Sequence, residues 1–541
     1  MLCCNVLMSL HRAAIVFLFL AASAVAQVNV PAALKLDDKE KQLEDLYADY
    51  WRTEYKIALG DQQLSSGPIQ DRIRAVVSDD SFLADLKAAR LNDPLLKRRR
   101  DLFLEEATFT RISNDPKLTT LVETITKEEN GILYEVSNNA VSNNEVTNNA
   151  VNNKKLTRAE LSNLVANSAD RRLREQAWKA RAQITARNGD RIRQAMKLRN
   201  DLALRFTNTI FSIFMLRRKG VETQDLFSWF EQLRSETEPE YQQLLQQMRR
   251  ELHVDKIEPW DLEYYFSTLS NDFEQQHFAP DDGWSKTRQL AATLGYDLDK
   301  LPVEMRTADL SFAGAAYPIL YGKDVKILAN RYAGIRFYDR LLHSTGHALH
   351  YSMVNEPSFL LRANSAEPFD EGLAQVMALM LYRPDVDTKL FALNAAQAAT
   401  MAERYRLKSL FDLRDTMADS LFEFDAYADP DQDLSTLYNR IYSQYVGVEM
   451  HDTPVWAYNP MYGSDPIYLQ SFVVADMVAR QIQHTLDKKF GSQWGKPAGD
   501  YLRDHFYSRG ASENLSQIMQ AGTAERLNAK YLIEQLRGPN R

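Results

Sequence analysis

Long stretches of good helix formers constrain the fold of this chain more than any other feature of its sequence. Gly (20) and Pro (18) are both infrequent among 541 residues, whereas Ala, Leu, Gln, Glu, Lys and Arg recur in runs without breakers, which favours helix over strand. From Leu43 onward, apolar residues recur at spacings of three and four, the period of an amphipathic helix. The same pattern occupies 82–107 with a break at Pro94, and then 118–134, 158–205 and 223–252. We therefore predict a mostly α protein.

The segment from Ala308 to Ala333 has a different pattern. Its short apolar runs are punctuated by Gly314 and Gly322, which is typical of strands and turns and predicts a small sheet. Helical patterns resume from Phe337 and occupy 390–424, 438–446, 468–490 and 511–536. Because no charge run or Pro/Gly linker divides the chain cleanly, we predict one domain with two lobes over residues 27–541.

The N-terminus carries the pattern of a signal peptide over residues 1–26. An apolar run follows Arg12 and ends before Ala24-Val25-Ala26, the small-x-small pattern after which signal peptidases cut. A transmembrane anchor is the alternative, but the run is shorter than the roughly 20 residues that a span requires. We expect an exported protein, periplasmic or secreted. Cys3 and Cys4 both lie in this leader, so we expect no thiol catalysis and no cysteine-ligated metal.

Residues 137–154 repeat with a five-residue period rich in asparagine. Asparagine and serine disfavour helix interiors, so this segment is interpreted as a low-complexity surface insertion, with a short stacked β-coil as the alternative. The formal charge is −8, and basic and acidic residues alternate along most of the chain. The basic run 97–100 is typical of a solvated helix face. No basic stripe with interleaved aromatics recurs, which argues against nucleic-acid binding.

Three of the nine histidines fall within His343-Ser344-Thr345-Gly346-His347-Ala348-Leu349-His350. On a helix, positions four apart project from one face, so His343 and His347 can reach a single ion. Such a pair is a weak motif by itself. Twenty-four residues after His347 comes Glu371, where Pro368 can open a second helix. A carboxylate there would complete a His/His/Glu set, a ligand combination that suits zinc.

Two histidines at this spacing followed by a glutamate on the next helix resemble the gluzincins, in particular the angiotensin-converting-enzyme-like peptidases. The thimet-oligopeptidase-like family is a near neighbour. Upstream, Tyr321-Gly322-Lys323-Asp324-Val325-Lys326-Ile327 resembles the strand that precedes the zinc helix in the converting-enzyme family and lies beside its peptide groove. The helical arrays, including the Trp178 region, are similar in order. The resemblance implies that His343, His347 and Glu371 bind Zn²⁺ in a two-lobed helical metallopeptidase, with a small β-sheet beside a deep central cleft.

The chain departs from the family pattern at three positions. Ser344 replaces the glutamate that takes a proton from the attacking water, and the loss of a general base typically costs roughly 10²–10⁴-fold in rate. Gln375 stands where the family has an aspartate that orients a zinc histidine, so an amide would replace a charge. Tyr468 fits the first of the family's paired tyrosines, which holds substrate, whereas Ser471 stands where the second would stabilise the oxyanion. Tyr468 can equally be read as an ordinary core residue.

Three further side chains near the motif allow more than one interpretation. Glu367 and Asp370 lie close in sequence to Glu371 and could replace the missing base, or they could be N-terminal helix charges that favour the dipole. His350 could be a fourth ligand, but a third imidazole would close the open site, which favours a packed or surface histidine.

Three functional hypotheses follow. The first is an exported zinc-binding metallopeptidase-like protein that binds peptides but hydrolyses them weakly or not at all, a pseudoenzyme. The second is an active zinc metallopeptidase, of oligopeptidase or peptidyl-dipeptidase type, with a substituted base. The third is a metal-free helical scaffold in which the histidines merely pack. Peptides or oligopeptides are the expected partners in the first two.

Overall fold

The computed structural model describes residues 30–136, 154–269, 272–310 and 312–538. The predicted signal peptide lies outside these residues, as does the predicted insertion apart from Lys154. Among the described residues, no helix is both long enough and apolar enough to cross a membrane.

Helices form nearly all of the first half, as the apolar periodicity predicts. They are α2 (Val30–Ala58), α3 (Gly67–Val77), α4 (Asp80–Ala88), α5 (Pro94–Ser113), α6 (Pro116–Gly131), α7 (Arg158–Asn167), α8 (Arg171–Ala180), α9 (Ala182–Thr207), α10 (Phe211–Arg218), α11 (Thr223–Glu236), α12 (Glu238–Glu251), α13 (Pro259–Thr268), α14 (Asp272–His277) and α15 (Gly283–Thr293). The break predicted at Pro94 is confirmed, because Asp93 caps the Leu96 N–H and Pro94 opens α5.

The second half is also helical. It contains α16 (Ile335–Met353), α17 (Phe359–Ala363), α18 (Glu367–Leu379), α19 (Pro384–Leu390), α20 (Ala395–Ala428), α21 (Leu434–Val446), α22 (Met461–Ser464), α23 (Leu469–Phe490), α24 (Lys496–Leu502), α25 (Leu515–Thr523) and α26 (Lys530–Arg537). The prediction of a mostly α protein with a small sheet is confirmed.

Two small sheets interrupt the helices. β1 (Tyr134–Val136) pairs antiparallel with β2 (Lys154–Leu156), so these two strands flank the segment 137–153. The second sheet has the order β3-β5-β4 and comprises β3 (Val303–Thr307), β4 (Gly314–Leu320) and β5 (Asp324–Ala329). β4 and β5 lie in the glycine-punctuated segment where a small sheet was predicted, and they pair antiparallel, whereas β3 joins β5 in parallel and lies just before the predicted region.

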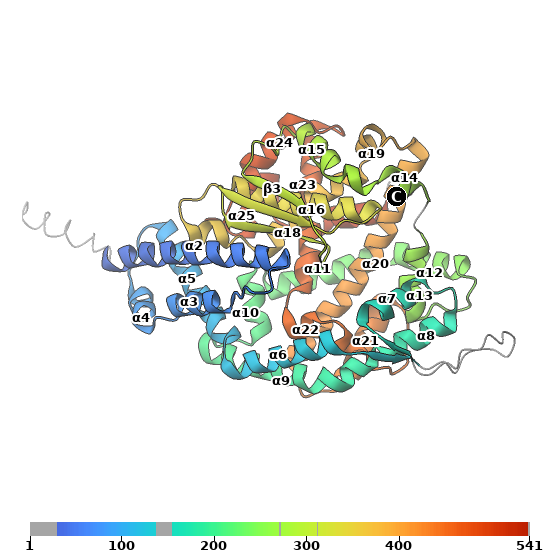
Figure 1. Cartoon of the computed structure of the whole chain (residues 1–541), viewed down its shortest axis with the longest axis horizontal. Helices are drawn as coiled ribbons and strands as arrows, with labels where there is room; N and C mark the ends of the chain where they lie inside the picture. Colours follow the sequence, from blue (N-terminus) through green and yellow to red (C-terminus); the bar gives the residue numbers. More distant parts are fainter. Residues whose placement is uncertain (1–29, 137–153, 270–271, 311, 539–541) are drawn as a thin grey trace, which may run out of the picture.

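A stack of three helices, of which α16 lies on the larger sheet, determines where the histidine motif lies. α16 contacts β4 and β5 on one side and α18 on the other, and α18 in turn packs against α23. In Figure 1 the sheet, α16, α18 and α23 lie in the upper part of the view, and α6, α9, α21 and α22 lie in the lower part. The long helix α20 runs between the two parts and contacts both α9 and α23.

Cavities lie on both sides of the α16/α18 pair. One of about 640 Å³ lies between α16 and α20, and Asp339 and Arg340, one turn before His343, contribute to its wall. Another of about 370 Å³ is lined by α5, α6 and α10, together with Glu367 and Tyr468. Both cavities thus lie beside helices of the histidine motif, one at α16 and the other at the start of α18.

Candidate metal centre

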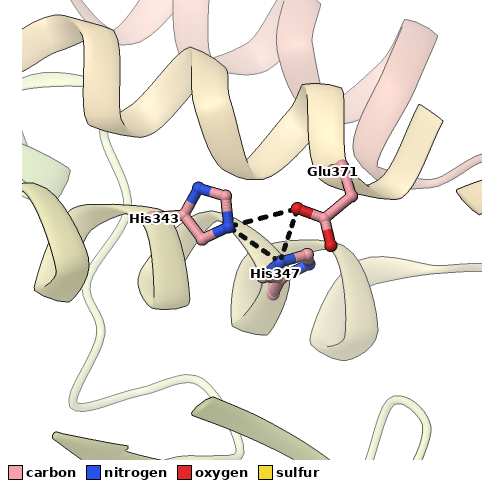
Figure 2. Close-up of side chains that lie close together, drawn as sticks. All are labelled: His343, His347 and Glu371. Carbon is pink, nitrogen blue, oxygen red and sulfur yellow. Dashed lines mark hydrogen bonds and ion pairs between the residues drawn. The ribbon is translucent and has the colours of Figure 1, made fainter. Parts of the chain in front are cut away.

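α16 carries both histidines of the motif and is fixed against the sheet. It begins after Gly334, whose φ of +100° is a backbone conformation that glycine adopts without strain. Ala348 packs into a small apolar cluster with Val325 and Ile327 of β5, so this face of the helix rests on the sheet. The histidines at 343 and 347 project toward α18 instead, as Figure 2 shows.

Two glycines bring α18 unusually close to its neighbours. A Cβ added at Gly346 would lie 2.6 Å from the Cα of Ala374 and 2.9 Å from the Leu373 carbonyl oxygen, both in the backbone of α18. On the other side of α18, a Cβ at Gly372 would lie 2.6 Å from Val478 Cγ1 of α23. Because both positions lack a side chain, the backbones of α16 and α18 meet directly, and the Val478 side chain of α23 packs onto the backbone of α18. This close crossing places the first turn of α18 beside the histidines.

His343, His347 and Glu371 converge on one point (Figure 2). The two Nε2 atoms are 3.2 Å apart, and Glu371 Oε2 lies 3.3 Å from His343 Nε2 and 3.8 Å from His347 Nε2. Tetrahedral zinc with bonds of about 2.0–2.2 Å holds its ligand atoms roughly 3.3–3.5 Å from one another. The spacing and the donor set, two imidazole nitrogens and one carboxylate oxygen, therefore fit zinc.

The three ligand candidates are largely but not completely buried. Their side chains are 16%, 13% and 14% exposed for His343, His347 and Glu371. Burial by itself would raise the pKa of Glu371, but hydrogen bonding and the charges of the two histidines hold it below its ordinary value. The carboxylate is thus kept ionised, which is the form that binds a cation.

Asp370, the residue before Glu371, organises the opposite edge of the centre. Its Oδ2 lies 3.1 Å from His347 Nδ1 and accepts the Tyr351 hydroxyl at 2.8 Å, while its Oδ1 lies 2.8 Å from His350 Nδ1. Burial opposes ionisation of Asp370, yet His347 and His350 hold its pKa well below the ordinary value. Because an ionised carboxylate can only accept, His347 donates from Nδ1, so in the neutral imidazole that binds a metal the Nε2 lone pair faces the site.

The amide nitrogen of Gln375 makes a contact other than the one that the resemblance implied. The resemblance placed this amide beside a zinc histidine, but its Nε2 donates to the hydroxyl of Tyr405 at 3.2 Å. Asp370 makes the carboxylate contact to a histidine that the family pattern assigned to position 375. The side chain at 370 starts from the first turn of α18, which faces α16, whereas 375 lies more than a turn further along the helix.

His350 is a packed histidine rather than a ligand that faces the centre. It is 1% exposed, and its Nε2 lies 3.0 Å from the carbonyl oxygen of Arg509. Both ring nitrogens therefore have protein partners. The sequence interpretation that set it apart from the ligands agrees with this placement.

Tyr468 holds the third ligand from the C-terminal side. Its hydroxyl donates to Glu371 Oε1 at 2.7 Å, which leaves Oε2 directed at the two imidazoles. The preceding residue, Ile467, has φ +59°, a conformation that a β-branched residue adopts only under strain. Of the two interpretations of Tyr468 that the sequence allowed, contact with the site is the one that the structure displays.

Buried polar groups hold the strained backbone at Ile467 in place. Its N–H donates to Glu423 Oε1 at 2.9 Å, and its carbonyl accepts from the Lys219 ammonium and from the Gln470 amide, each at 2.5 Å. Burial raises the pKa of Glu423 to about 8, although the Ile467 N–H and nearby cations work against this rise. Neither Lys219 nor Glu423 was singled out from the sequence, because their partners lie 248 and 44 residues away.

Lys219 also binds the first residue of α18. Its ammonium lies 2.6 Å from Glu367 Oε1 and 3.4 Å from Ser471 Oγ, and it stands 4.7 Å from the centre of the Tyr468 ring. Burial lowers the pKa of Lys219, and Glu367 opposes that change. Glu367 is therefore paired with a cation, and Ser471 is fully buried.

Ser344 lies on α16 next to His343 and is 1% exposed.

The segment 321–327, which the resemblance placed beside a peptide groove, is the turn before β5 and part of that strand. Gly322 N donates to the carbonyl of Tyr351 at 2.8 Å, and the Tyr321 and Tyr351 rings meet edge to face. This segment thus supports the C-terminal end of α16 directly behind Asp370.

Comparison with solved structures shows the class of fold. The chain is similar to the crystal structure of an M32 carboxypeptidase from Deinococcus radiodurans R1, with a TM-score of 0.67 over 94% of this chain and 98% of that one. Sequence identity is 12%, so this likeness shows the helical fold alone. No protein-family model matches the sequence, and no curated protein matches it. The affiliation with converting-enzyme-like peptidases stays a prediction.

Proposed function

We propose that this chain is an exported, zinc-binding, metallopeptidase-like protein that binds peptides and hydrolyses them weakly or not at all. The observation that carries the proposal is the convergence of His343, His347 and Glu371, with ligand atoms 3.2–3.8 Å apart, on a fold shared with a carboxypeptidase. A structural neighbour with that activity supports peptides as the ligand class.

The surrounding residues would prepare the centre for a metal ion. Asp370 directs the His347 lone pair toward the site, and Tyr468 turns one oxygen of Glu371 toward it. A bound zinc ion would act as a Lewis acid toward a peptide carbonyl. Two histidines and one glutamate leave a coordination position for substrate, as catalytic rather than structural zinc sites do.

Proton transfer is the step for which this centre is poorly equipped. Ser344 has a hydroxyl where a carboxylate base is needed, and a serine hydroxyl is too weak a base to accept a proton from water at neutral pH. Both nearby carboxylates that could replace it are engaged: Glu367 pairs with Lys219, and Asp370 accepts from His347, His350 and Tyr351. Binding without efficient turnover is the consequence that we draw.

Restoring the base is the sharpest test. We expect Ser344→Glu to raise hydrolysis of a mixed peptide library by roughly 10²-fold or more, since general-base catalysis contributes 10²–10⁴-fold. Ser352→Glu, the same change on α16 at a half-buried serine, is the matched control and should leave turnover unchanged. Zinc content, measured by mass spectrometry in all three proteins, shows whether each variant keeps its centre.

Other outcomes select the competing hypotheses. Wild-type turnover that a chelator abolishes would favour an active peptidase with a substituted base. If the protein holds no stoichiometric zinc, and replacing His343 by Ala does not change its metal content, the result would instead favour the metal-free helical scaffold. No gain from Ser344→Glu in a zinc-loaded protein would show that the base is not the missing element.

A further inference from the structure

The cavity of about 370 Å³ beside Tyr468 lies within the size range of ligand pockets, roughly 300–1,000 Å³. It opens among helices that the histidine motif does not include: α5, α6 and α10 (Figure 1). Most of its inner wall is apolar. The residues that form this wall are Phe109, Ile112, Leu118, Val122, Phe211 and Met215.

The two buried cations in the lining, Lys219 and Arg199, are already paired, whereas the acidic lining residues Glu123 and Asp465 are exposed to solvent. Lys219 is bound by Glu367 and by the Ile467 carbonyl. Arg199 donates to the Gly463 carbonyl oxygen at 2.8 Å and lies 3.2 Å from the Tyr427 hydroxyl. A charged ligand group that enters the buried part of the cavity would lose its hydration without gaining an unpaired partner, whereas an apolar group would gain contact area there. The cavity therefore suits an apolar occupant.

Tyr468 connects this cavity to the candidate metal centre. The residue lines the cavity, and its hydroxyl donates to Glu371 Oε1. The cavity and the ligand are thus separated by one aromatic side chain. An extended peptide advances about 3.3 Å per residue, so two residues span about 6.6 Å, on the order of the length of one tyrosine side chain. A side chain one or two residues from a bond held at the centre can therefore reach the cavity.

We propose that this cavity receives an apolar side chain, aliphatic or aromatic, of a peptide whose neighbouring backbone lies at the His343, His347 and Glu371 centre. The assignment rests on the proposed function and adds the class of side chain that the protein selects. Selectivity arises from burial of the side chain against α5, α6 and α10.

Two adjacent threonines on α6 give a matched test. Thr119 lines the cavity and is half-buried, whereas Thr120 is exposed on the same helix. Thr119→Trp would fill the cavity, and Thr120→Trp adds the same group outside it. The affinity of the zinc-loaded full chain is measured by fluorescence polarisation for labelled peptides that differ at one scanned position, occupied by Gly, Leu, Phe, Lys or Asp.

At one of the scanned positions, we expect peptides with Leu or Phe to bind at least about tenfold more tightly than peptides with Gly, Lys or Asp. Thr119→Trp should reduce this preference to less than about threefold, and Thr120→Trp should keep it. Three results would contradict the proposed role of this cavity while leaving peptide binding intact. They are a preference for a charged residue, equal binding of all peptides, and an apolar preference that survives Thr119→Trp. A zinc-loaded wild type that binds none of the peptides would overturn the proposed function and the pocket together.

Discussion

Replacing Gly346 by alanine tests whether the close helix crossing sets the geometry of the centre. The added Cβ would lie 2.6 Å from the Ala374 Cα, whereas ordinary contacts begin at 3.4 Å. The clash is with backbone, so α16 and α18 must separate by about 0.8 Å, and overpacking of this kind costs about 1–3 kcal/mol. Zinc sites tolerate deviations of only about 0.2 Å in ligand distance.

We therefore expect Gly346→Ala to weaken zinc binding by at least about 10-fold, comparable to the loss of a supporting hydrogen bond at a metal ligand. Competition with a chromophoric chelator measures the dissociation constant, and urea unfolding of the metal-free protein measures the stability cost separately. Gly131→Ala is the control, because a Cβ there meets nothing within 4 Å. Wild-type zinc affinity in Gly346→Ala would refute the argument that this crossing positions Glu371.

Three further substitutions probe the surroundings of the centre and one distant buried acid. Asp370→Asn should weaken zinc binding by about 10–100-fold, as chelator competition can show, because His347 loses a charged partner. Tyr468→Phe removes the hydroxyl that holds Glu371 and should weaken zinc binding by up to about 10-fold in the same assay. Asp387 is fully buried with both carboxylate oxygens lacking hydrogen-bond partners, and burial raises its pKa to about 8. Between pH 3.8 and 8 the unfolded chain releases a proton that the folded chain keeps, so stability falls as pH rises through this window. Asp387→Asn should therefore stabilise the protein by about 1–4 kcal/mol at pH 7.5 and by little at pH 4, measured by urea unfolding, and an equal effect at both pH values would contradict this account.

The sequence predicted the helical part of the fold well because its signals are local. Apolar spacing located the helices, and Pro94 marked a real boundary with a capping aspartate before it. β3 was missed, because it pairs in parallel with a strand about 20 residues later and alternates little between buried and exposed positions. Parallel pairing of this kind leaves no turn signature between its two strands.

The sequence predicted those residues of the candidate centre that helical spacing brings together, and missed those whose partners lie far away in the chain. His343 and His347 follow from their spacing, and Glu371 follows from its place in the first turn of the helix that Pro368 opens. The resemblance assigned the contact with a zinc histidine to position 375, whereas in the structure Asp370 contacts His347 and the Gln375 amide donates to Tyr405. Lys219 left no local signal, since it meets Glu367 from a position 148 residues earlier in the chain.

The contact between Tyr468 and Glu371 also bears on the order in which the centre is completed during synthesis. All three donor side chains emerge within a short stretch of chain, but the hydroxyl that orients Glu371 follows 97 residues later. A nascent chain that ends before Tyr468 would contain all three candidate metal ligands but would lack the hydroxyl that orients Glu371. High-affinity metal uptake is therefore expected late, after the C-terminal helices dock, and the metal would stabilise the finished fold more than its precursors.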